Sequence, residues 1–121
     1  MTRRTKALGD LGERAAEDHV RRLGWRVLDR SWRRRSGELD LVAADGETVV
    51  FIEVKARSSS RFGLPEESVG RAKQARLSRL AQSYLQERGL TGRPARFDVI
   101  ALSGGELRHI RGAFMAGGFS L

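Results

Sequence analysis

The spacing of hydrophobic residues predicts an amphipathic helix over residues 10–23. Its apolar positions recur every three to four residues, which places them on one face of a helix, and Gly24 follows as a C-terminal stop. Residues 25–32 then mix β-forming side chains with charged ones, which predicts a strand. A basic turn, residues 31–36, separates this strand from the next hydrophobic run.

Two further hydrophobic runs, residues 39–44 and 48–54, predict a β-hairpin. Both runs are rich in Val, Ile, Leu and Phe, and the pair Asp45-Gly46 between them is typical of two-residue hairpin turns. These runs would therefore form the second and third strands of the chain, joined by a tight turn.

The remainder of the chain predicts a second helix and two more strands. After a serine-containing loop, Ser68 has the side chain of an N-cap, and the helix would end near Arg88, where a glycine follows. Residues 96–102 and 107–110 predict the last two strands, and a Gly-rich tail begins at Gly112.

The order of these elements is helix, three strands, helix and two strands, and it predicts an α/β fold with a mixed central sheet flanked by helices. The helix between the third and fourth strands suits a crossover that joins parallel neighbours. A chain of 121 residues with 40% hydrophobic content is sufficient for one core, so we expect a single domain over residues 1–121.

The charge balance favours a polyanionic partner. Lys and Arg number 23 against 15 Asp and Glu, which gives a net charge of +8, and nucleic acid is the leading candidate. An anionic membrane is the alternative, but the chain has neither a basic helix with a bulky apolar face nor a lipidation signal. We find no apolar run of signal-peptide or transmembrane type, so we expect a cytoplasmic protein without a membrane partner.

The chain contains no cysteine, which excludes disulfides, thiol nucleophiles and thiolate metal sites. A bound metal would therefore use oxygen or imidazole ligands.

The predicted hairpin turn sets which charged residues face each other. If Asp45 and Gly46 form the turn, Asp40 lies opposite Phe51, and Glu38 lies opposite Glu53. Alternation then places charged residues at the far end of one face and only apolar residues on the other. The first face carries Glu38, Asp40, Val42, Val49, Phe51, Glu53 and Lys55, and the second carries Leu39, Leu41, Ala43, Val50, Ile52 and Val54.

The clustered charges predict a metal site. Asp40 and Glu53 would be diagonal neighbours with Cα atoms ~7 to 8 Å apart, a span that two carboxylates can close around Mg²⁺ or Mn²⁺. Lys55 rises from the same face, where it could orient a metal-bound water or neutralise charge on a phosphate. The alternative is a strand end whose charges are simply solvated.

The residues of this hairpin resemble a nuclease signature. The run from Gly37 to Asp40, followed by Glu53-Val54-Lys55, resembles the Asp, Glu-x-Lys motif of the restriction-endonuclease-like PD-(D/E)xK superfamily. The chain is most similar to one branch, the bacterial YraN family, which resembles Holliday-junction resolvases. The matching positions span nearly the whole chain: Gly12-Glu13, Arg33, Gly37-Glu38-Leu39-Asp40, Phe51-Ile52-Glu53-Val54-Lys55, Arg57, Phe62-Gly63, Lys73, Arg96-Phe97-Asp98-Val99-Ile100, His109-Ile110 and Ala113-Phe114.

The resemblance implies a restriction-endonuclease-like core and a role for each motif residue. Asp40 and Glu53 correspond to metal ligands, Lys55 to the catalytic lysine, and Glu13 to an additional acidic residue of the first helix. Leu39 stands where the superfamily motif has proline.

Other residues are candidates for substrate contacts. Glu13 lies at the margin of the apolar stripe, where it could face the sheet or only favour the helix start. Lys73 lies within the apolar face of the second helix, where it could contact a phosphate or extend out of the core to solvent. Glu38 is a further acidic candidate. The basic residues on both sides of the acidic strands should grip a nucleic-acid backbone, and they are Arg33, Arg34, Arg35, Arg57 and Arg61.

Three residues have structural interpretations. His19 and His109 show no ligand spacing that relates them to each other, so we expect structural roles for both. Asp98 opens the fourth strand, and we expect it to pair with a nearby arginine.

Three functions follow from these patterns. The first is a metal-dependent endonuclease acting on DNA phosphodiesters, including branched DNA. The second is a nucleic-acid-binding module of the same fold without turnover, and the third is a basic RNA-associated protein whose carboxylates are structural. A homodimer would suit a two-stranded junction by symmetry.

Overall fold

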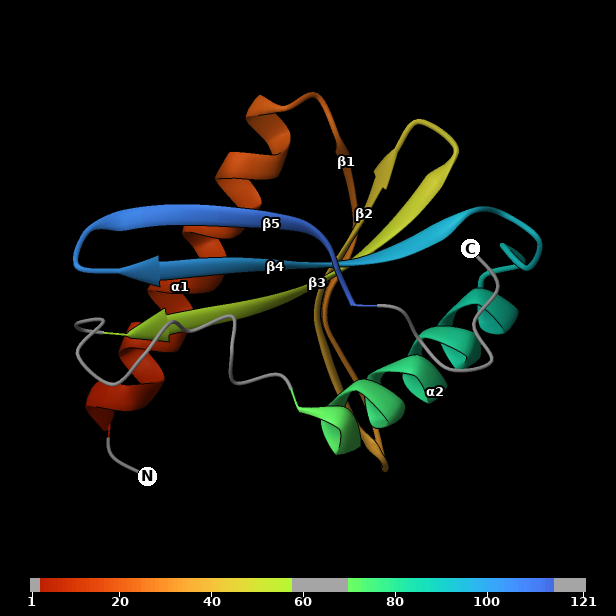
Figure 1. Ribbon diagram of the computed structural model, residues 1–121, viewed down its shortest axis with the longest axis horizontal. Coiled ribbons are helices and arrows are strands. Elements are labelled where there is room, and N and C mark those ends of the chain that lie inside the picture. The colour runs from red at the N-terminus through yellow and green to blue at the C-terminus, as the bar shows by residue number, and fades with distance from the viewer. Residues whose placement is uncertain (1–2, 58–69, 115–121) are drawn as a thin grey trace.

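The computed structural model describes residues 3–57 and 70–114 and shows a five-stranded sheet with a helix on each face (Figure 1). The elements are α1 (Arg3–Arg22), β1 (Arg26–Arg34), β2 (Gly37–Asp45), β3 (Thr48–Arg57), α2 (Arg71–Glu87), β4 (Ala95–Ser103) and β5 (Glu106–Phe114). The predicted α/β class and the order of elements are therefore confirmed.

The sheet is mixed, and its strands follow chain order from β1 to β5. Three neighbouring pairs are antiparallel, and the pair of β3 and β4 is parallel. The predicted crossover through the second helix is thus confirmed, because α2 connects the two parallel strands. Strands β2, β3 and β4 lie inside the sheet, where both of their faces can be covered.

Two hydrophobic clusters hold the helices on the sheet. Beneath α2, Leu80 and Tyr84 pack with Phe51. On the other face, Ala16 and Val20 of α1 pack with Ile52. Because adjacent residues of β3 enter different clusters, the predicted alternation of this strand is confirmed.

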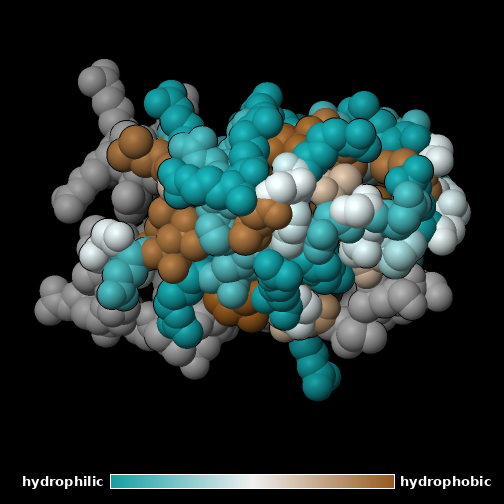
Figure 2. Space-filling model, turned by 90° about the horizontal axis from the view of Figure 1, so that it is seen from above, coloured by the Kyte–Doolittle hydropathy of each residue, from teal (hydrophilic) through white to brown (hydrophobic). Residues whose placement is uncertain are grey.

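The surface outside these clusters is mainly polar. In the space-filling view from above, hydrophilic side chains predominate and the hydrophobic areas are limited in extent (Figure 2). The large hydrophobic side chains that stay exposed in the described residues are Leu11 and Leu23. Within the same residues, no helix has the length and apolar character needed to cross a membrane.

Several predicted boundaries were wrong. Helix α1 begins at Arg3 rather than near residue 10, because Arg and Lys are good helix formers that leave no hydrophobic periodicity. Helix α2 begins at Arg71 with Gly70 in the N-cap position, and the predicted cap Ser68 lies outside the described residues. Strand β1 continues to Arg34, through residues predicted as a turn. Strand β5 is longer than predicted because its pairing with β4 extends to Phe114.

The predicted hairpin register was also wrong. The turn consists of Gly46 and Glu47, so that Asp45 pairs with Thr48 and Val42 pairs with Phe51. Gly46 has a φ of 60°, a conformation that glycine adopts without steric cost. It occupies the first position of the turn, whereas the prediction placed it at the second. The pairing is therefore shifted by two residues, which leaves Glu38 no longer opposite Glu53.

At Asp40, the side chains of strand β2 switch the face of the sheet to which they point. Leu39 packs in the cluster beneath α2, whereas Leu41 packs in the cluster beneath α1. Residues two apart on a regular strand share a face, so the predicted grouping of Leu39 with Leu41 was wrong. The neighbouring strand is irregular at the same level, because Ser31 has a φ of 51° between two residues that pair with Leu39 and Leu41.

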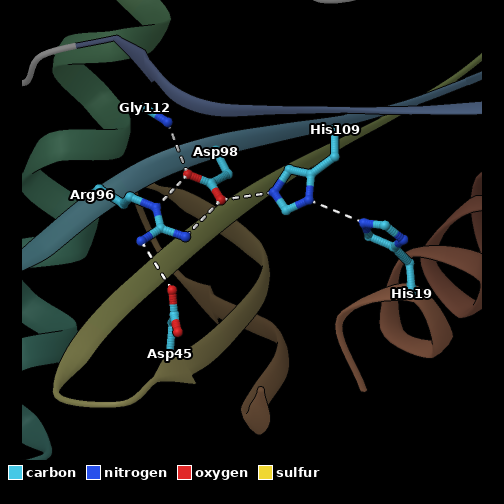
Figure 3. Close-up of polar contacts among 6 residues, drawn as sticks. All are labelled: His19, Asp45, Arg96, Asp98, His109 and Gly112. Atoms are coloured by element: carbon cyan, nitrogen blue, oxygen red, sulfur yellow. Dashed lines mark hydrogen bonds and ion pairs between the residues drawn. The ribbon is translucent and has the colours of Figure 1, made fainter. Parts of the chain in front are cut away.

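A buried ionic network connects α1 with the sheet (Figure 3). Asp98 is fully buried and accepts hydrogen bonds from Arg96 Nε at 3.0 Å and from the Gly112 amide at 3.0 Å. His109 Nε2 lies 2.8 Å from Asp98 Oδ2, and its Nδ1 lies 3.0 Å from His19 Nε2 on α1. The expected pairing of Asp98 with an arginine is confirmed, and the two histidines meet although 90 residues separate them.

The network keeps Asp98 ionised. Burial pushes the pKa of Asp98 up, but the hydrogen bonds from His109 and Arg96 outweigh it and lower the pKa below its ordinary value. Since the ionised carboxylate accepts only, His109 donates its Nε2 proton, and its Nδ1 faces His19.

Helix α1 approaches β3 closely at Gly12. A Cβ atom at this position would lie 2.9 Å from the Cβ of Ala56, whereas one at Gly9 would meet nothing within 4 Å. The close approach at Gly12 places the following residue, Glu13, beside the sheet.

We expect Gly12→Ala to destabilise the fold by about 1–3 kcal/mol, because the added methyl group overpacks the contact with Ala56. Gly9→Ala is the matched control and should stabilise by up to about 1 kcal/mol through helix propensity. Urea denaturation of both variants measures the difference. Equal effects of the two substitutions would show that α1 does not lie this close to β3.

We expect Asp98→Ala to lose about 3–5 kcal/mol of unfolding free energy at neutral pH, because buried partners are left without their counter-charge. The Asp98 pKa is lowered in the folded protein, so this stabilisation is present above the ordinary value of 3.8 and is lost as the pH falls through the folded value. Denaturation of both proteins over a pH series should show the difference shrinking in acid. A constant difference would argue against an ionised Asp98.

Candidate functional site

Asp40 lies where the pairing of β2 and β3 ends. The last paired residues are Leu41 and Ile52, and the next residues along the two strands are Asp40 and Glu53. The Val54 amide donates a hydrogen bond of 2.9 Å to Asp40 Oδ2, so a side chain replaces the backbone acceptor at this point. The corrected register thus brings Asp40 and Glu53 closer than the diagonal arrangement that we predicted.

Glu53 is buried, Asp40 is partly buried, and their carboxyl groups interact directly. Burial, followed by a hydrogen bond with Glu53 and the charge of Glu53, raises the pKa of Asp40 to about 8. Burial also pushes the pKa of Glu53 up, but hydrogen bonds with Asp40 and Lys73 outweigh it and lower the pKa. At neutral pH the pair therefore retains a proton, which a cation between the carboxylates would displace.

Two lysines approach Glu53 from different elements. Lys73 of α2 places its Nζ 2.5 Å from Glu53 Oε2, and Lys55 of β3 places its Nζ 3.5 Å from the same oxygen. Burial, together with the neighbouring Lys73 ammonium, lowers the pKa of Lys55. Lys73 thus reaches from the apolar face of α2 to β3, the middle strand of the sheet.

Glu13 and Glu38 approach Asp40 from its other side. One carboxylate oxygen from each of these three residues lies within 4.8 Å of the others. Burial and the negative charges of Glu38 and Asp10 raise the pKa of Glu13. The change of facing side at Asp40 is consistent with this position of Glu38, which the regular hairpin had placed across from Glu53. Asp40 thus lies between Glu53 and a second pair of acids.

Two open cavities flank Asp40. One, about 350 Å³ in volume, lies between the β1–β2 turn and α2 and is lined by Asp40, Glu53 and Lys73. The other, about 220 Å³, lies beside α1 and is lined by Asp40, Glu13 and Arg30. Asp40 is therefore accessible from both sides of the strand end despite being largely buried.

The predicted basic residues separate into different roles. Arg34 pairs with Glu87 at 2.5 Å, which attaches β1 to the end of α2. Its guanidinium also lies 4.0 Å from the ring centroid of Trp32 on the same strand. Arg33 pairs with Glu38 at 3.5 Å. Arg35 is exposed and forms no ion pair with the described residues.

The remaining predicted basic positions are not described. Arg57 ends β3, but the structure does not describe its side chain, and Arg61 lies outside the described residues. Their predicted contacts with nucleic acid stay predictions.

Arg76 was not among the residues predicted for the site. It lines the larger cavity together with Lys73, from which it is three residues distant on α2. Helical residues three apart share a face. The spacing from Lys73 could therefore have indicated Arg76 from the sequence.

Comparison with known proteins identifies the family. The model of the family described as "Uncharacterised protein family UPF0102" matches residues 12–102. The chain belongs to this family. The resemblance to YraN proteins is thereby confirmed. The matched segment contains Glu13, Glu38, Asp40, Glu53, Lys55 and Lys73.

Relatives match over most of their length. A UPF0102 protein of Moorella thermoacetica is 53% identical over 102 residues, which cover 84% of this chain and 83% of the relative. A UPF0102 protein of Frankia casuarinae is 49% identical and covers 89% and 96% of the two chains. Another, of Frankia alni, is 48% identical and covers 94% and 100%.

Proposed function

We propose that this protein is a divalent-metal-dependent nuclease with a restriction-endonuclease-like core that hydrolyses phosphodiester bonds of DNA, including branched DNA. The observation that carries the proposal is the position of Asp40, between Glu53 on one side and Glu13 with Glu38 on the other. Acidic groups that are buried or partly buried beside one another repel unless a positive charge balances them.

The donor atoms fit Mg²⁺ or Mn²⁺. All of them are carboxylate oxygens, which these hard cations prefer, and the flanking cavities leave space for water and a phosphate. Asp40 and Glu53 would hold the metal, with Glu13 and Glu38 available as further ligands. A bound divalent ion would lower the pKa of water and offset negative charge on the phosphate.

The protein's own side chains have separate tasks in hydrolysis. Lys55 donates hydrogen bonds from its ammonium to the phosphate oxygens, where negative charge increases in the transition state. Its pairing with Glu53 fixes the direction of the ammonium group. Glu13 and Asp40 accept hydrogen bonds from the attacking water and orient it toward phosphorus. Exposed arginines such as Arg35 attract the nucleic-acid backbone.

A second function is favoured by two specific contacts. Lys73 and Lys55 both pair with Glu53, and together they balance this acid without a metal. Such a site could serve a nucleic-acid-binding module that does not cut its ligand. The two functions differ in metal binding and in turnover, which are separately measurable.

We expect Mn²⁺ to raise the thermal midpoint of the protein, because an ion that binds only the folded state stabilises it by about 2.7 kcal/mol at 100 times its Kd. Asp40→Asn should abolish the shift, whereas Asp18→Asn, which changes an exposed acid of α1, should retain it. Thermal unfolding with and without Mn²⁺ measures both. Equal shifts in the two variants would show that the ion binds elsewhere.

We expect purified protein to cleave branched or duplex DNA in Mg²⁺ or Mn²⁺, and Asp40→Asn, Glu53→Gln and Lys55→Met to lower the rate by at least about 100-fold. Asp18→Asn again serves as the control. Cleavage that survives both carboxylate substitutions would show that the site assignment is wrong.

Two other outcomes of the same assay would favour the alternatives. If the protein binds DNA in a salt-dependent manner but cuts no substrate, it is a binding module. If it prefers single-stranded or duplex RNA, the RNA-associated function replaces both.

A further inference from the structure

Arg76 forms part of the wall of the larger cavity beside Asp40. The cavity is lined by Asp40, Glu53 and Lys73 together with Arg76, so acidic and basic groups face the same space. The strand carrying the acids approaches α2 closely at Gly37, where a Cβ would lie 3.1 Å from Leu80 Cδ1 and 3.9 Å from Arg76 Cδ. The aliphatic part of Arg76 therefore lies near the start of β2.

Two other arginines at this end of the site are already paired with acids. Arg33 pairs with Glu38, and Arg34 pairs with Glu87. Arg76, by contrast, is exposed and forms no ion pair with any residue that the structure describes. Its guanidinium donors therefore have no acidic partner among the described residues, and an incoming anion can use them.

The position of Lys73 and Arg76 near the start of α2 adds to the attraction for an anion. Lys73 and Arg76 both lie in the first two turns of α2, whose first turn contains no acidic residue. The dipole of a helix is positive at its N-terminal end, so it attracts an anion to the same place as the two side chains. Lys73 already pairs with Glu53, so it connects this positive wall with the carboxylates.

We propose that Arg76, assisted by Lys73, is a phosphate-binding site that holds the backbone of the nucleic-acid strand beside Asp40. The substrate class rests on the proposed function, whereas the residue is assigned from the cavity itself. Arginine binds a phosphate through two parallel hydrogen bonds, which fix its orientation as well as its position. The bound phosphate would lie within the cavity that Asp40 and Glu53 also line, which aligns the strand with the acids.

Arg79 provides the comparison for an ordinary surface arginine. It is one turn further along α2, is exposed, and does not line the cavity. A general attraction of the basic helix for DNA would depend on Arg76 and Arg79 equally, whereas a phosphate site depends on Arg76 alone.

Binding is measured by fluorescence anisotropy with labelled branched and single-stranded DNA in EDTA, so that no cleavage occurs. We expect Arg76→Ala to raise the Kd by about 10-fold or more and to reduce the slope of log K against log salt by about 1. Arg79→Ala should change the Kd by less than about 2-fold. Arg76→Lys should keep most of the salt slope but bind more weakly than the parent, because it lacks the paired donors.

Thermal unfolding of each variant separates loss of binding from loss of fold, and Arg76→Lys preserves the aliphatic contact over Gly37 if Arg76→Ala is unstable. In a cleavage assay, Arg76→Ala should raise KM more than it lowers kcat, because the residue holds the strand. Equal effects of the Arg76 and Arg79 substitutions would overturn the assignment.

The experiment also distinguishes the phosphate site from the nuclease proposal. If the parent protein binds DNA but does not cut it, a larger effect at Arg76 than at Arg79 still supports the site, and only the nuclease proposal fails. If the parent protein binds no nucleic acid, the phosphate site is overturned together with the proposed substrate.

Discussion

Asp40 and Glu53 lie side by side where β2 and β3 stop pairing, with Glu53 buried and Asp40 partly buried. Two carboxylates that are removed from water repel each other strongly unless a proton or a cation lies between them. The surrounding elements must therefore supply positive charge to this pair. The described contacts supply positive charge from one direction through Lys73 and Lys55. From the other direction, Glu13 and Glu38 add further negative charge, which increases the demand for a cation.

The fold brings these groups together by attaching α1 and α2 to opposite faces of one sheet. Helix α1 approaches β3 closely at Gly12 and is connected to β4 and β5 through His19, His109 and Asp98. Helix α2 is held by the aromatic cluster around Tyr84, with ring centroids of Phe51 and Trp32 at 5.8 and 5.3 Å. Because both helices are fixed on the sheet, each holds a charged side chain at the same strand end, and these side chains have little room to move.

The backbone is irregular at Ser31 and Asp40. This local irregularity leaves the acidic groups around Asp40 open to a cavity on each side. A regular strand would direct Glu38 and Asp40 to the same face, and Leu39 to the face of Leu41. The observed change of side buries Leu39 beneath α2 and leaves Glu38 beside Glu13. A non-glycine residue with positive φ, here Ser31, is strained, and such strain is typical of sites where function constrains the backbone.

The sequence by itself determined the class and order of the elements, the family resemblance and most residues of the candidate site, because hydrophobic periodicity and short motifs are local properties of the chain. It also indicated Lys73, whose place among apolar helix residues directed it toward the sheet. The tertiary structure decided the turn at Gly46 and Glu47, the meeting of Glu13 with Glu38, and the contact between His19 and His109. It also divided the arginines into those paired with acids, such as Arg34, and those facing the cavity, such as Arg76. These features depend on packing between segments far apart in the chain, where one shift of register or one bend changes which side chains meet, and no local pattern records that choice.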